Sequence, residues 1–122
     1  MSVTLNIPAN TNCGLMVFCN SAYYQKAIVT PSGGTPITLY KTTSGASTNL
    51  MISSPNQSFS SGSTGQVTVD IQYSKDNKTW SESQLSQGSL GVSTTYMWVV
   101  ASEDANDNDY NDTVVVVNTP IG

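Results

Sequence analysis

The residues best suited to chemistry are concentrated at positions 102–112, which read SEDANDNDYND. Five of the eight acidic residues of the chain fall within this stretch, and three asparagines lie between them. Like charges this close repel each other by roughly 1 kcal/mol per pair even in water, so a folded domain needs a way to neutralise them. Carboxylate and amide oxygens are the ligands that calcium prefers, so the stretch predicts a calcium site. Its acidic residues are Glu103, Asp104, Asp107, Asp109 and Asp112.

A simple turn is the ordinary alternative, because Asp and Asn side chains bond their own backbone and tolerate left-handed conformations. The density of carboxylates favours the metal interpretation, since only 10% of the chain is charged, against about a quarter in typical proteins. The net charge is -4, arginine and histidine are missing from the sequence, and the lysines are scattered. The chain therefore has no basic patch for nucleic acid or for an anionic membrane surface.

The same composition argues against catalysis. Without histidine, arginine or a G-x-S-x-G motif, nucleophilic and phosphoryl-transfer chemistry lack the residues that they need. A glycosidase needs two carboxylates about 5 to 9 Å apart across a cleft, whereas the dense carboxylates here share one loop. An EF-hand does not fit either, because loop position six counted from Asp104 is Asp109 and not glycine. We expect a binding protein and not an enzyme.

Short β-strands are predicted to position the acidic loop. Strand-like segments recur about every ten residues, separated by glycine, proline, serine and asparagine, and helix signals are almost absent. The clearest strand is predicted where Val67, Val69, Ile71 and Tyr73 alternate with polar residues. This alternation is typical of a strand with one buried face.

The acidic stretch is predicted to join two adjacent central strands, over residues 95–101 and 113–118, the second being a buried strand with four consecutive valines. Residues 85–91 are predicted to be a loop. The chain is thus expected to be an all-β protein, an antiparallel β-sandwich of about nine strands that forms a single domain over residues 1–122. The other strands are predicted at residues 4–7, 14–19, 26–30, 37–41, 50–53 and 79–83.

The two cysteines, Cys13 and Cys19, lie in one predicted strand. An extended chain would separate them by about 20 Å, far beyond the reach of a disulfide, so both are expected to be reduced. The sequence shows no signal-peptide pattern and no apolar run long enough to span a membrane. We therefore expect synthesis in the cytoplasm, followed by release or by association with the cell surface.

The acidic loop and the C-terminus resemble those of the small soluble LecB-type (PA-IIL-like) bacterial lectins, which bind fucose and mannose through two adjacent calcium ions. The resemblance is carried by residues 102–104 and 107–112, by the valine strand, and by the Pro-x-Gly sequence at residues 120–122. Residues 8–11, together with Gly14, Phe18, Asn20 and Ser21, match the first strands of the family. The similarity spans the whole chain, with a few extra residues in the middle.

The resemblance implies two calcium ions at each sugar site. Glu103 and Asp107 match ligands of the first ion, and Asp109 and Asp112 match carboxylates that bridge both ions. Gly122 matches a C-terminal glycine whose carboxylate reaches the second calcium of the partner subunit. A homodimer is therefore implied, and whether dimers pair into a homotetramer stays open. The implied metal ligands are Asn20, Glu103, Asp107, Asp109, Asn111, Asp112 and Gly122.

The resemblance also implies how the sugar is selected. Asp104 matches a residue that hydrogen-bonds the sugar, and Ser21, Ala22 and Tyr23 stand where the family often has Ser-Ser-Gly. Ser21 keeps the hydroxyl that favours fucose in the family, Ala22 loses one, and Tyr23 adds a ring that either stacks on a sugar or fills space. The preference between fucose and mannose therefore stays open. The implied sugar-binding residues are Ser21, Ala22, Asp104, Asp107, Asp109, Asp112 and Gly122.

A calcium module without sugar binding is the alternative. Residues 104–108 read D-x-N-D-N, which looks like the calcium linker between cadherin repeats. The cadherin linker joins two domains, whereas this motif leads into one last strand, and the arginine-containing motif of that family is missing here. A structural or adhesive calcium-binding β-sandwich is thus the second hypothesis.

Overall fold

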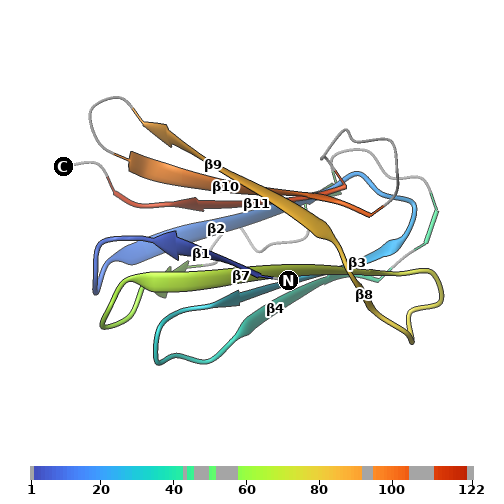
Figure 1. The fold of residues 1–122 in the computed structure, drawn as a ribbon, viewed down its shortest axis with the longest axis horizontal. Coiled ribbons are helices and arrows are strands. Elements are labelled where there is room, and N and C mark those ends of the chain that lie inside the picture. The colour runs from blue at the N-terminus through green and yellow to red at the C-terminus, as the bar shows by residue number, and fades with distance from the viewer. Residues whose placement is uncertain are drawn as a thin grey trace.

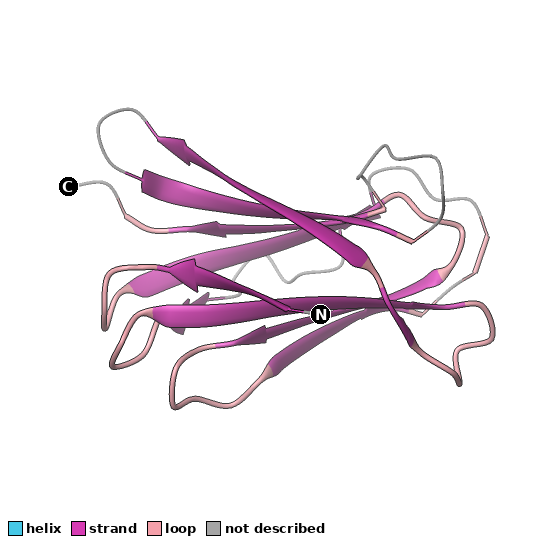
Figure 2. Ribbon diagram, in the orientation of Figure 1, coloured by secondary structure: helices cyan, strands magenta, loops and turns pink. Residues whose placement is uncertain are grey.

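The computed structural model describes residues 2–42, 44–45, 50–51, 58–91, 95–104 and 112–120. Two antiparallel sheets face each other and enclose the core (Figure 1). Within these ranges all the regular structure is β-strand, and loops join the strands (Figure 2). The described residues include no helix of the length and apolarity that a membrane crossing requires. The predicted all-β sandwich is confirmed.

The first sheet contains the alternating strand that the sequence predicts most clearly. Its strand order is β1-β7-β3-β4, and β8 pairs with the end of β7. On β7, Val67, Val69 and Ile71 are fully buried, whereas Thr68 and Asp70 lie half-buried on the outer face. The strands of this sheet are β1 (Ser2–Asn6), β3 (Tyr24–Thr30), β4 (Ile37–Lys41), β7 (Gln66–Ser74) and β8 (Ser81–Glu82).

The second sheet contains the two strands that flank the acidic stretch. Its order is β5-β2-β11-β10-β9, and β6 pairs with β2. Because β10 and β11 are neighbours inside this sheet, the acidic stretch connects adjacent central strands, as predicted. The strands are β2 (Asn12–Cys19), β5 (Leu50–Met51), β6 (Ser58–Ser60), β9 (Gln84–Gly91), β10 (Thr95–Glu103) and β11 (Thr113–Asn118).

The valine strand β11 is fully buried on one face only. Val115 and Val117 point into the core with no exposed surface, while Val114 and Val116 lie half-buried on the outer face. Each fully buried valine stabilises the fold by roughly 1.5–3 kcal/mol relative to an exposed one. On the neighbouring strand β2, Met16 pairs with Val116 and is 39% exposed. The outer face of this sheet is therefore apolar.

The prediction of a loop at residues 85–91 is wrong, because this segment forms most of strand β9. It pairs with β10 from Gln84 opposite Glu103 to Gly91 opposite Thr95. The polar and glycine-rich sequence hides the strand from a search for hydrophobic alternation, while backbone hydrogen bonds to β10 hold it at the sheet edge. Strands β6 and β9, neither of which was predicted, raise the count from the expected nine to eleven in the described chain. Strands β5 and β8 are shorter forms of the strands predicted at residues 50–53 and 79–83.

The core lies between the two sheets. Cys13 and Cys19 are buried free thiols, as predicted, and burial raises the pKa of both, which keeps them unreactive. The buried apolar side chains are Leu5, Ile7, Cys13, Leu15, Val17, Cys19, Ala27, Val29, Phe59, Val67, Val69, Ile71, Trp98, Val100, Val115 and Val117.

Gly65 permits a close backbone approach that positions β7 beside the segment that follows β1. Its φ is +74°, and its carbonyl accepts a hydrogen bond of 2.9 Å from the Ile7 N–H. A Cβ atom at Gly65 would overlap the carbonyl oxygen of Ile7. We expect Gly65→Ala to lower the free energy of unfolding by about 3 kcal/mol or more, because left-handed strain adds to backbone overlap. Equilibrium denaturation measures this loss.

Gly33 offers a matched control for this prediction. Its φ is +67°, but a Cβ atom there would meet nothing within 4 Å. Gly33→Ala should therefore cost only the left-handed conformation, about 1–2 kcal/mol. Equal losses in the two variants would contradict the packing role of Gly65.

Candidate metal centre

Strands β10 and β11 bring three carboxylates together at one end of the sandwich. Glu103 is the last residue of β10, Asp104 follows it, and Asp112 directly precedes β11. One carboxylate oxygen from each residue lies within 4.8 Å of the others. Glu103 and Asp112 are only 2% and 7% exposed. Buried carboxylates this close form a donor set that suits a hard divalent cation such as calcium.

Hydrogen bonds at the ends of the two strands fix this arrangement. The Asp104 N–H donates to Oδ2 of Asp112 at 2.8 Å, and the Asp112 N–H donates to the Ser102 carbonyl at 3.2 Å. Ser102 is fully buried. Its hydroxyl donates to the Thr113 carbonyl at 2.7 Å and accepts from the Thr113 N–H at 3.0 Å. The carboxylates are thus positioned by the strand ends before any ligand binds.

The Asp112 carboxyl is costly to ionise within this cluster. Its pKa is raised to about 7, and burial is the largest cause. The hydrogen bond from the Asp104 N–H opposes the shift, and the neighbouring Glu103 and Asp104 carboxylates contribute to it. A carboxyl that is this costly to ionise gains strongly from a bound cation, so the local electrostatics fit a metal site.

Asp104 is held from the opposite sheet. The Ser21 hydroxyl and the Gln25 side-chain amide both donate to Oδ2 of Asp104, the latter at 2.7 Å. The Gln25 side-chain oxygen in turn accepts a hydrogen bond of 2.6 Å from the Thr113 hydroxyl. Gln25 is fully buried on β3, so it ties the first sheet to the carboxylates of the second.

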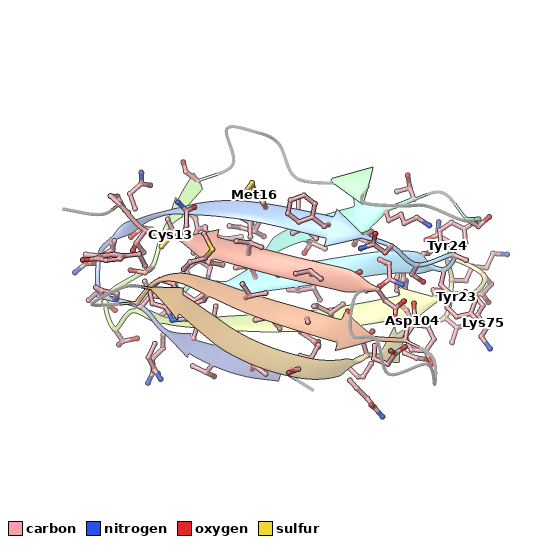
Figure 3. All side chains as sticks on the ribbon, turned by 90° about the horizontal axis from the view of Figure 1, so that it is seen from above. Cys13, Met16, Tyr23, Tyr24, Lys75 and Asp104 are labelled. Carbon is pink, nitrogen blue, oxygen red and sulfur yellow. The ribbon has the colours of Figure 1, made fainter. Side chains whose placement is uncertain are left out.

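The residues predicted to select the sugar lie against this cluster. The Asn20 N–H donates to the Asp112 carbonyl at 2.8 Å, and Ser21 Oγ accepts from the Tyr23 N–H at 3.0 Å. Ala22 is exposed. Figure 3 shows Asp104 at the same end of the sandwich as Tyr23. Residues 21–23, which we term the specificity loop, therefore border the metal centre, next to Asn20.

A buried lysine holds the specificity loop through a hydrogen bond to its backbone. Lys41 is 1% exposed, and its ammonium group donates to the Tyr23 carbonyl at 3.2 Å and to the Gly45 carbonyl at 3.4 Å. Burial lowers the pKa of Lys41, while the nearby Cys19 and the Asp104 carboxylate oppose this shift. Lys41 thus offsets part of the negative charge of the cluster and orders the loop beside it.

The structure brings together the predicted site residues that it describes. Sequence reasoning missed Gln25 and Lys41, although both are polar residues at inward positions of alternating strands, and that pattern could have flagged them. The predicted residues that form or contact the carboxylate cluster are Asn20, Ser21, Glu103, Asp104 and Asp112, and Ala22 follows Ser21 in the chain. The predicted residues outside the described part of the chain are Asp107, Asp109, Asn111 and Gly122.

Solved structures of bacterial lectins share this fold. A high-affinity mannose-binding lectin from Ralstonia solanacearum is 31% identical, with a TM-score of 0.77 over 98% of this chain and 96% of that one. A Chromobacterium violaceum lectin in complex with alpha-methyl-fucoside is 28% identical, with a TM-score of 0.75 over the same shares of the two chains. The C-terminal domain of a Burkholderia cenocepacia lectin, 22% identical, has a TM-score of 0.78 over the full length of both chains and supports the fold alone.

Comparison with curated proteins finds no match to this chain. The sequence profile of a lectin family, in contrast, matches residues 5–121, nearly the full length. Lectins bind carbohydrate without altering it chemically, so the expectation that the protein is not an enzyme is confirmed. The chain belongs to the fucose-binding lectin II (PA-IIL) family.

Proposed function

We propose that this protein is a lectin that binds a fucose- or mannose-type monosaccharide at the metal centre, with two calcium ions between the protein and the sugar. The observation that supports it most is the convergence of Glu103, Asp104 and Asp112 within 4.8 Å, beside the specificity loop. The similar proteins from Ralstonia and Chromobacterium, described as mannose-binding and as bound to a fucoside, support the sugar class.

The charges of the proposed ligand set match two calcium ions. Glu103, Asp107, Asp109 and Asp112 supply four negative charges, and a terminal carboxylate on Gly122, where that residue ends the chain, supplies a fifth. Two calcium ions carry +4, so the loaded site is close to neutral. Bound calcium would offer coordination positions that neutral sugar hydroxyls can occupy, because it accepts about 6 to 8 oxygen ligands. The asparagine oxygens of Asn20 and Asn111 complete the proposed set.

The protein's own polar groups orient the sugar. Asp104 accepts hydrogen bonds from Ser21 and Gln25 on one carboxylate oxygen, which fixes the direction of the carboxylate and leaves lone pairs of the other oxygen for a sugar hydroxyl. Asp104 is half-buried, whereas Glu103 is fully buried. The sugar therefore contacts Asp104 and the specificity loop at the rim, and the proposed metal ligand Glu103 lies deeper in the protein.

A homodimer is part of this proposal. In the family pattern the C-terminal carboxylate of one subunit reaches the second calcium of its partner, and Gly122 stands in that position. The outer face of the second sheet supplies apolar surface for association, with Met16 exposed and Phe18, Val99, Val114 and Val116 half-buried.

Isothermal titration with two simple glycosides tests the proposed function. Methyl α-L-fucoside and methyl α-D-mannoside are titrated into calcium-loaded protein and again after calcium removal with EDTA. We expect binding only in the presence of calcium, and the ratio of the two dissociation constants then defines what the specificity loop selects. Calcium uptake without binding of either sugar would refute the lectin proposal and leave a structural calcium module.

A further inference from the structure

A small pocket lies beside the specificity loop, on the first sheet and the turn between β7 and β8. Its volume is about 240 Å³, below the roughly 300–1,000 Å³ of sites for drug-sized ligands, so its size suits a single sugar ring. Hydroxyl groups, one aromatic ring and one ammonium group are the main features of its wall. The lining residues are Tyr73, Ser74, Lys75, Asp76, Thr79 and Ser81.

An aromatic pair connects this pocket to the specificity loop. The rings of Tyr23 and Tyr73 are stacked, with centroids 5.9 Å apart and an interplanar angle of 24°. The Lys75 ammonium lies 5.5 Å from the centroid of the Tyr23 ring. All three side chains retain exposed surface. One wall of the pocket, Tyr73, is therefore in direct contact with the loop that borders the metal centre.

Strand register places the pocket next to the groups that hold Asp104. Tyr73 lies directly opposite Gln25 on β3 and opposite Ser81 on β8, and residues directly opposite in an antiparallel pair share a face. Gln25 donates to the Asp104 carboxylate. Figure 3 shows Asp104, Tyr23 and Lys75 at the same end of the sandwich. The pocket wall formed by Tyr73 is therefore adjacent to Gln25, which holds Asp104 at the proposed sugar site.

The polar groups of the pocket suit sugar hydroxyls. The turn occupies one oxygen of the Asp76 carboxylate, since Oδ1 accepts hydrogen bonds from the N–H groups of Lys78 and Thr79 at 2.8 Å each and from the Ser74 hydroxyl at 3.0 Å. The exposed hydroxyls of Thr79 and Ser81 and the Lys75 ammonium offer donors on the pocket wall. An aromatic ring beside a few such donors matches a pyranose, which has apolar C–H groups and a polar hydroxyl rim.

We propose that this pocket is a second subsite, which binds the sugar residue next to the calcium-bound one, so that the preferred ligand is an oligosaccharide. The inference rests on the proposed function, since it extends the same site. Tyr73 and Tyr23 contact the second ring, and Lys75 donates to its hydroxyls. The specificity loop then separates the two subsites, with the calcium-bound sugar on the side of Asp104.

Titration with linked sugars tests the second subsite. The positional isomers of mannobiose and of fucosyl-N-acetylglucosamine are compared with the two methyl glycosides in calcium-loaded protein. We expect the best disaccharide to bind roughly three- to tenfold tighter than its monosaccharide, the gain of one aromatic contact. Tyr73→Leu and Lys75→Ala should remove or reduce this advantage while the affinity for the monosaccharides stays unchanged.

Lys78→Ala is the matched control, because it removes the same charge from an exposed position of the same turn, outside the pocket lining. It should retain the disaccharide advantage. If Tyr73→Leu does not fold, Ser81→Phe blocks the pocket from the exposed strand β8 and gives the same test. Loss of the advantage in Lys78→Ala, its survival in Tyr73→Leu or Ser81→Phe, or the lack of any disaccharide preference would overturn the subsite. Failure of both monosaccharides to bind would instead refute the proposed function itself.

Discussion

Adding calcium to the metal-free protein should raise its melting temperature by about 10 °C or more at saturating metal. Glu103 and Asp112 are buried within 4.8 Å of each other and of Asp104, so the metal-free fold confines like charges that unfolding would release into water. Calcium that binds only the folded state removes this repulsion and stabilises by mass action. Differential scanning calorimetry with calcium and with EDTA measures the shift.

The rise in melting temperature that calcium produces should increase with pH. The pKa of Asp112 is raised to about 7 in the metal-free fold, so the stability that its protonated form contributes is present at low pH and is lost as the pH rises from about 4 through 7. Calcium needs the ionised form. The gain in melting temperature should therefore be larger above about pH 7 than at about pH 5.

Magnesium provides the control for metal type. It demands six ligands in a smaller octahedron and gives up water reluctantly, so an equal concentration should produce a much smaller shift. If calcium did not shift the melting temperature at any pH, the result would contradict a metal site at this cluster. It would favour the alternative that the acidic stretch is a simple turn.

The sequence predicts the central strands of this fold well because their side chains reflect their environment. On β7, alternation of valine and isoleucine with polar residues corresponds to one buried and one outer face. The edge strand β9 was missed because its place depends on backbone pairing with β10 rather than on a hydrophobic face. On β11 the run of valines suggested full burial, yet only Val115 and Val117 are fully covered, since an outer sheet face has no layer above it within the described chain.

The acidic ligands of the site could be predicted and their supports could not. Five carboxylates within eleven positions can be recognised in the sequence itself, whatever the position of the loop in the fold. The contact of Gln25 with Asp104 joins residues 79 positions apart, and only the packing of the two sheets reveals it. Lys41 is similar, because its role follows from burial beneath the Tyr23 carbonyl. The acidic ligands can be identified from the sequence by their residue types and spacing. The residues that support them come from distant segments, so they can be identified only in the three-dimensional structure.

Replacing Asp112 with asparagine should abolish sugar binding, with a loss of roughly 100-fold or more in affinity for methyl α-L-fucoside or methyl α-D-mannoside, whichever binds. The substitution preserves shape, and the new amide oxygen can still accept the Asp104 N–H that now donates to Oδ2 at 2.8 Å. It removes one negative charge from a carboxylate proposed to bridge both ions. Isothermal titration in saturating calcium measures the loss.

The stability of the same variant separates this role from misfolding. Above about pH 7 the wild-type Asp112 must ionise against burial and the Glu103 carboxylate, whereas asparagine stays neutral. The metal-free variant should therefore be at least as stable as the metal-free wild type, while its gain from calcium falls. Glu82→Gln serves as the control, because it makes the same acid-to-amide change at an exposed position of β8 that is not one of the three clustered carboxylates, and should leave sugar affinity unchanged. Full sugar affinity in Asp112→Asn would exclude Asp112 as a calcium ligand, and a large loss of metal-free stability would show instead that its carboxylate serves the fold.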